Sequence, residues 1–66
     1  MTGKLVRPIF PSVAVWIEAT KITTKVTSDE VMLCLFVDYK RFLMKILLPD
    51  GRIAHVNPTY FEEVVQ

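Results

Sequence analysis

Apolar residues dominate the middle of the chain. Residues 31–37 (VMLCLFV) are all apolar, and residues 42–48 (FLMKILL) carry a single charge. Residues 38–41 (DYKR), which separate the two runs, are polar. If these four residues form a turn, the two runs pair as antiparallel strands in which Val37 faces Phe42.

A second turn follows at Pro49-Asp50-Gly51. Proline suits the second position of a type I turn, aspartate tolerates the third, and glycine takes the left-handed position that closes a bulge. We therefore predict a hairpin with a three-residue loop and with Leu48 opposite Arg52. The same register places Lys45 opposite His55.

The resulting three-stranded meander has two apolar faces. One face carries Val31, Leu33, Leu35, Val37, Phe42, Met44, Ile46, Leu48 and Val56. The other carries Met32, Cys34, Phe36, Leu43, Leu47 and Ile53, with Lys45, His55 and Asn57 among them. A small antiparallel sheet normally leaves one face in water. The second face is therefore expected to need a cover.

The first half of the chain also has strand-like patterns. Pro8 and Pro11 favour extended backbone. Residues 12–19 alternate, with Val13, Val15 and Ile17 on one side and Ala14, Trp16 and Glu18 on the other. Residues 20–27 alternate as well and are rich in β-branched side chains. Together with the meander, these segments predict a single all-β domain over residues 1–66, a small antiparallel barrel of five to six strands.

An alternative interpretation of residues 29–48 is an amphipathic helix, with Ser28 as its N-cap and Pro49 as its stop. It gives an α+β fold in which the helix is followed by the 49–51 hairpin. Against it, Leu33, Val37, Met44 and Leu48 would lie among the polar residues of such a helix. The strand-rich flanks also favour the sheet, so we prefer the β interpretation and keep the helix as the alternative.

Composition adds three constraints. The chain has 66 residues, of which 52% are hydrophobic, and its mean hydropathy is +0.36. A domain of this size has little interior, and its core cannot bury all of these hydrophobic residues. The remaining ones are expected at a contact with a protein partner or with another copy of the chain. The net charge of +1 does not favour a nucleic-acid partner. One cysteine and no long apolar run predict a cytoplasmic protein with no membrane segment.

The residues that carry chemistry are few and isolated. His55 is the only histidine, Cys34 is the only cysteine, and the two glycines are far apart. Adjacent carboxylates such as Glu62 and Glu63 point to opposite faces of a strand. We therefore expect no catalytic residues, no metal site and no cofactor.

The segment Asp50–Val65 (DGRIAHVNPTYFEEVV) resembles the end of a Src-homology-3-like small barrel. In that family a hairpin strand leads into a short helical turn bearing a proline and a tyrosine, and then into a last acidic, β-branched strand. Pro58, Tyr60 and residues 62–65 fill these parts here. Trp16 lies far earlier than the family's ligand-stacking tryptophan. The resemblance thus implies the architecture rather than a proline-peptide groove.

Two functions are consistent with these patterns. The preferred one is a non-enzymatic small β-barrel that acts by protein–protein contact, as a homo-oligomer or a regulatory subunit. Its predicted contact surface consists of Met32, Phe36, Leu43, Lys45, Leu47, Ile53 and His55. The alternative is a small nucleic-acid-binding barrel that uses Tyr39, Lys40, Arg41, Lys45 and Arg52. Trp16, Tyr60 and Phe61 are further candidate anchors of an interface.

Overall fold

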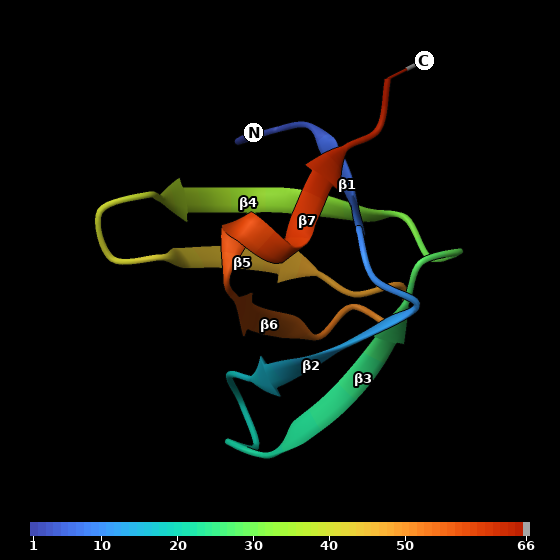
Figure 1. Ribbon diagram of the computed structural model, residues 1–66. Coiled ribbons are helices and arrows are strands. Elements are labelled where there is room, and N and C mark those ends of the chain that lie inside the picture. Colours follow the sequence, from blue (N-terminus) through green and yellow to red (C-terminus); the bar gives the residue numbers. More distant parts are fainter. Residues whose placement is uncertain (66) are drawn as a thin grey trace.

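One antiparallel sheet, curled into a half-barrel, makes up most of the chain in the computed structural model, which describes residues 1–65 (Figure 1). Its strands are β1 (Leu5–Pro8), β2 (Ser12–Ile17), β3 (Thr23–Thr27), β4 (Met32–Asp38), β5 (Leu43–Leu47), β6 (Ile53–Val56) and β7 (Phe61–Glu63). A single 3-10 turn, η1 (Pro58–Tyr60), connects β6 to β7. The strand order across the sheet is β3-β2-β6-β5-β4-β1-β7.

The prediction of a small all-β antiparallel domain is confirmed, although the sheet has seven strands rather than five or six. The alternative helix over residues 29–48 is wrong, because β4 and β5 occupy this segment. The sheet buries Met44 and Leu48, which the helix would have left on its polar side. Within residues 1–65, no helix combines the length and the hydrophobicity needed to cross a membrane.

The hairpin between β5 and β6 forms as its turn residues predict. The Leu48 amide donates to the Arg52 carbonyl at 2.8 Å, and the Gly51 amide donates to the Leu48 carbonyl at 2.9 Å. Gly51 has a φ of +91°, in the left-handed region that glycine adopts without a steric penalty. The register that follows pairs Lys45 with His55, which is also as predicted.

The pairing of β4 with β5 differs from the prediction. Val37 lies opposite Met44, not opposite Phe42, and the register shifts between Cys34 and Phe36. A bulge of this kind adds one unpaired residue to a strand and reverses which side chains face the core. Phe42 is part of the connecting loop, where it is exposed, and has a φ of +52°.

The bulge overturns part of the predicted face assignment. Met32 and Cys34 were expected on the second, outward face, but they are 1% and 0% exposed and belong to the core. Leu33, opposite Leu47, lies on the outward side instead. Every residue of 31–37 is apolar, so the sequence pattern carries no information about where the strand changes face.

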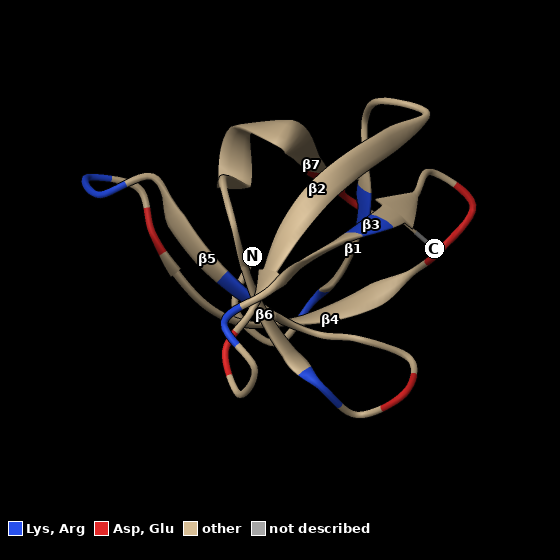
Figure 2. Ribbon diagram, turned by 90° about the horizontal axis from the view of Figure 1, so that it is seen from below, with Lys and Arg blue, Asp and Glu red and all other residues tan. Residues whose placement is uncertain are grey.

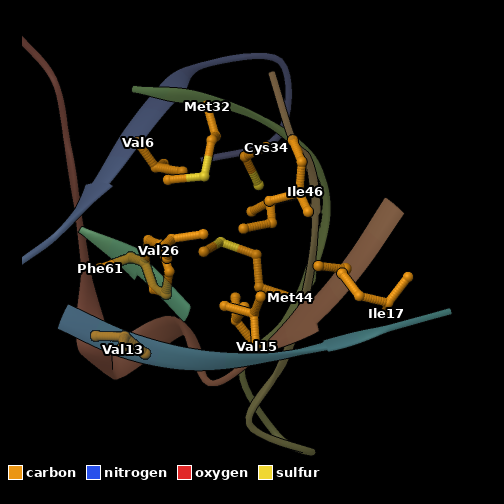
Figure 3. Packing of buried hydrophobic residues seen from close by; sticks show 13 residues of the cluster. Val6, Val13, Val15, Ile17, Val26, Met32, Cys34, Met44, Ile46 and Phe61 are labelled. Carbon is orange, nitrogen blue, oxygen red and sulfur yellow. The ribbon is translucent and has the colours of Figure 1, made fainter. Parts of the chain in front are cut away.

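The core fills the concave side of the curled sheet (Figure 3). It consists of Val6, Val13, Val15, Ile17, Val26, Met32, Cys34, Met44, Ile46, Leu48, Ala54, Val56 and Phe61. Among residues 1–65, no polar or charged residue is buried. The alternate residues of β2, β5 and β6 therefore face outward, together with Phe36 and Leu33 of β4. We call this solvent-facing side of β2, β4, β5 and β6 the outer face.

Candidate interaction surface on the outer face

Pairing between four strands places one row of side chains across the outer face. Phe36 is opposite Lys45, Lys45 is opposite His55, and His55 is opposite Trp16. Leu43, Leu47 and Ile53 are half-buried on the same side. Six of the seven residues predicted for the contact surface thus share the outer face. Met32 is the exception, because it lies in the core.

At the centre of the row, Glu18, Lys45 and His55 form an ionic cluster. Glu18 Oε1 accepts a hydrogen bond from Lys45 Nζ at 3.1 Å and lies 3.0 Å from Nε2 of His55. The contact with His55 and, to a lesser extent, the contact with Lys45 hold the pKa of the Glu18 carboxyl below its ordinary value of 4.5. The carboxylate therefore neutralises the charge that Lys45 brings to the outer face.

The sequence predicted that Lys45 lies beside His55, but it did not predict that Glu18 contacts them. Glu18 is 27 residues from Lys45 and 37 residues from His55. It reaches them because β2 pairs with β6, a long-range contact that no local pattern encodes. The alternation of residues 12–19 did place Glu18 on the same side of its strand as Trp16.

The cluster lacks the groups that nucleophilic or metal chemistry requires. Cys34 is buried on the opposite side of the sheet, and burial raises the pKa of its thiol, which disfavours the reactive thiolate. In the part of the chain that the structure describes, no three His, Cys, Asp or Glu side chains gather into a group that could hold a metal ion. The geometry is that of a polar centre within an apolar surface.

On the outer face, around β2 and β6, aromatic side chains border a groove of about 400 Å³. Trp16, Phe42 and Tyr60 form its walls, and Ala14, Leu43 and His55 also line it. A second hollow of about 360 Å³ shares Ala14 and Tyr60 with the first and extends to Phe10. We call the two hollows together the aromatic groove.

Contacts between the rings order the walls of the aromatic groove. The Trp16 ring meets the His55 ring edge-on, with 4.9 Å between centroids, and Phe10 meets Tyr60 edge-on at 5.8 Å. Trp16 and Phe42 are nonetheless 37% and 61% exposed. Of the anchors suggested by the sequence, Trp16 and Tyr60 lie at this surface, whereas Phe61 is buried in the core. Phe10 was not anticipated.

The five residues predicted for nucleic-acid binding do not form one patch. Tyr39, Lys40 and Arg41 lie together in the loop before β5. Arg52 lies in the turn after β5 and pairs with Asp50 at 2.6 Å. Lys45 lies between them and is bound to Glu18. Figure 2 shows the Lys and Arg residues spread over several loops and strands.

Comparison with known proteins adds no relative: no protein-family model, no curated protein and no solved structure matches the chain. The resemblance of residues 50–65 to the Src-homology-3-like barrels therefore stays a prediction.

Proposed function

We propose that the protein is a non-enzymatic small β-barrel module that acts by protein–protein contact through the part of the outer face formed by β4, β5 and β6. One observation carries the proposal. Phe36 is 46% exposed in the middle of a strand, and Leu33, Leu47 and Ile53 are half-buried on the same side. Contiguous apolar surface of this kind on a soluble domain marks an interaction site.

The charge on this surface suits a protein partner. Burying an unpaired lysine is costly, but Lys45 already has Glu18 as its counter-ion. Because an acid and a base lie side by side, a second copy related by two-fold symmetry can exchange these partners without leaving a buried charge. We therefore take another copy of the chain as the first partner to test.

The size of the domain also favours this surface. A stable interface buries about 800 Å² on each partner, which is roughly a fifth of the 4308 Å² that this domain exposes. The SH3-like architecture belongs to the same proposal, supported by η1, which carries Pro58 and Tyr60 and leads directly into β7.

Sedimentation equilibrium of matched variants tests the proposal. Phe36→Lys places a charge in the middle of the surface, and the lysine stem retains part of the packing of the phenylalanine. Ile22→Lys makes the same change at a 59% exposed residue in the turn between β2 and β3. We expect the unmodified chain to form dimers or higher oligomers as its concentration rises, and only Phe36→Lys to weaken them.

Circular dichroism and thermal melting of both variants establish that the fold is retained. If the unmodified chain is a monomer at all concentrations and no protein partner co-purifies, the proposal is wrong. It is also wrong if Ile22→Lys weakens association as much as Phe36→Lys does.

A further inference from the structure

We propose that the aromatic groove binds a short stretch of single-stranded nucleic acid, whose bases stack on Trp16, Phe42 and Tyr60. This activity goes beyond the proposed protein contact, although the two surfaces share Leu43 and His55. Phe36, on which the protein contact depends, does not line the groove. Either proposal can therefore fail without the other.

The lining of the groove indicates a ligand with flat, uncharged groups. No Asp, Glu, Lys or Arg is among the described residues that line either hollow. The rings of Trp16, Phe42 and Tyr60 border it and remain accessible to solvent. Exposed aromatic rings along a groove stack nucleobases with little dependence on sequence, because every base has a π-face.

Positively charged residues neighbour residues of the groove in two parts of the chain. Lys25 lies opposite Ala14 in the sheet, and Lys21 Nζ is 5.2 Å from the centroid of the Trp16 ring. Lys40 and Arg41 directly precede Phe42 in the loop before β5. Among the ion pairs formed within residues 1–65, none includes Lys21, Lys25 or Lys40. No ion pair in this part of the chain therefore offsets Lys25 or Lys40, and the charge of Lys21 faces the Trp16 ring.

Two carboxylates lie close to these cations in the sequence, Asp38 and Glu18. Asp38 Oδ1 accepts hydrogen bonds from the amides of Lys40 and Arg41 at 3.1 and 3.4 Å, and its Oδ2 lies 3.7 Å from Arg41 Nε. It therefore shapes the loop and partly offsets Arg41, while Lys40 has no ion-pair partner within residues 1–65. Glu18 contacts the groove residue His55, and its charge is offset by Lys45. Uncharged rings with separate cations nearby match the bases and the phosphates of one nucleic-acid strand.

The backbone of Phe42 gives independent support. Its φ of +52° is uncommon for a bulky residue, and such conformations concentrate at binding sites. The side chain gains little burial in return, since it is the most exposed of the four groove aromatics. The loop thus holds a large ring in water at the edge of the groove.

Trp16 provides the measurement, because it is the only tryptophan in the chain and lies in the groove. The probe is an oligothymidylate of about eight nucleotides, within the usual range of site sizes for such grooves. At low ionic strength we expect saturable quenching of Trp16 fluorescence. The affinity should fall with added salt with a logarithmic slope of about −2 to −3, from three or four phosphate contacts.

Matched variants separate stacking from charge. Phe42→Ala and Tyr60→Ala should each weaken binding about tenfold. Val31→Ala, which shortens an exposed apolar side chain outside the groove, should leave it unchanged. Lys25→Gln should reduce the salt slope by about 0.7, whereas Lys4→Gln, at an exposed lysine before β1, should not. Circular dichroism checks the fold of each variant.

Three results would overturn the proposal. The first is the absence of quenching by the oligothymidylate at low salt. The second is an equal loss of affinity with Val31→Ala and with Phe42→Ala. The third is quenching by an uncharged peptide that competes with the oligonucleotide and binds more tightly, which would make the groove a peptide site.

Discussion

The pairing of β5 with β6 can be tested by exchanging a large and a small side chain in the core. Ile46 lies opposite Ala54, and Ala54 lies opposite Ile17 on its other side. All three side chains are fully buried. The small residue therefore lies between two large ones, and the space at residue 54 is set by its neighbours.

Each single exchange should destabilise the fold for an opposite reason. Ile46→Ala leaves a cavity and should cost about 2–5 kcal/mol. Ala54→Ile overfills the same layer and should cost about 1–3 kcal/mol. The double variant Ile46→Ala/Ala54→Ile conserves the volume of the pair, so its cost should be below about 1.5 kcal/mol. Simple addition of the two single costs would give about 3–8 kcal/mol.

These differences are large for this domain, because 66 residues support a total stability of only about 3–10 kcal/mol. Urea denaturation followed by circular dichroism measures all four proteins. Leu47→Ala combined with Ala54→Ile is the control, since Leu47 faces outward and its effect should add to that of Ala54→Ile. If the exchange at 46 and 54 is also additive within about 0.5 kcal/mol, the two residues are not neighbours. The register that places Lys45 beside His55 would then be wrong as well.

Two further predictions concern the ionic cluster and the hairpin turn. Contacts with His55 and Lys45 lower the pKa of Glu18 in the folded state. The stabilisation from this carboxylate is therefore complete at pH values above its ordinary pKa of 4.5. It is lost as the pH falls through the lower pKa of the folded state. The melting temperature of the Glu18→Gln variant should therefore fall less than that of the unmodified chain between neutral pH and about pH 3. If the melting temperature depends on pH in the same way in both proteins, the cluster does not contribute to stability. Gly51→Ala should destabilise the fold by about 1 kcal/mol, through backbone strain alone, because a Cβ at this residue meets no atom within 4 Å. Gly51→Asn should cost less in the same urea denaturation assay, and equal losses for the two variants would contradict the explanation by strain.

The hairpin was predictable because its determinants are adjacent in the sequence. Pro49, Asp50 and Gly51 specify a three-residue loop, and the loop fixes the register of both strands that it joins. Lys45 and His55 were paired correctly for this reason. The outward placement of Leu43, Leu47 and Ile53 follows from the same register, because alternate residues of a strand share a face.

The bulge in β4 could not be predicted, because residues 31–37 contain no polar residue that distinguishes one face from the other. Either register buries an equally apolar set, so the choice depends on how the side chains fit the core. Cys34 pairs with Ile46 before the bulge and Phe36 pairs with Lys45 after it. The smaller side chain occupies the fully buried site, and the large ring is left outside.

The ionic cluster and the aromatic groove have a common origin in long-range pairing. Both depend on β2 lying beside β6, which pairs Trp16 with His55 although 38 residues separate them in the sequence. The alternation of residues 12–19 correctly predicted that Trp16 and Glu18 lie on the same side of the sheet. It could not identify the strand that pairs with β2. Phe42 and Tyr60 come to the same region through a loop and a 3-10 turn, neither of which has a hydrophobic period.

The bulge also connects the fold to the proposed contact surface. A strand with strict alternation needs polar residues on one side, and β4 has none until Asp38. Whichever register it adopts, apolar side chains face water, and the observed register leaves Phe36 and Leu33 outside the core. Exposed apolar area does not stabilise a monomer, but the same area removed from water by a partner contributes about 25 cal/mol per Å² before the cost of association. Part of the apolar excess of this sequence thus lies at the surface, where the proposed association would gain from it.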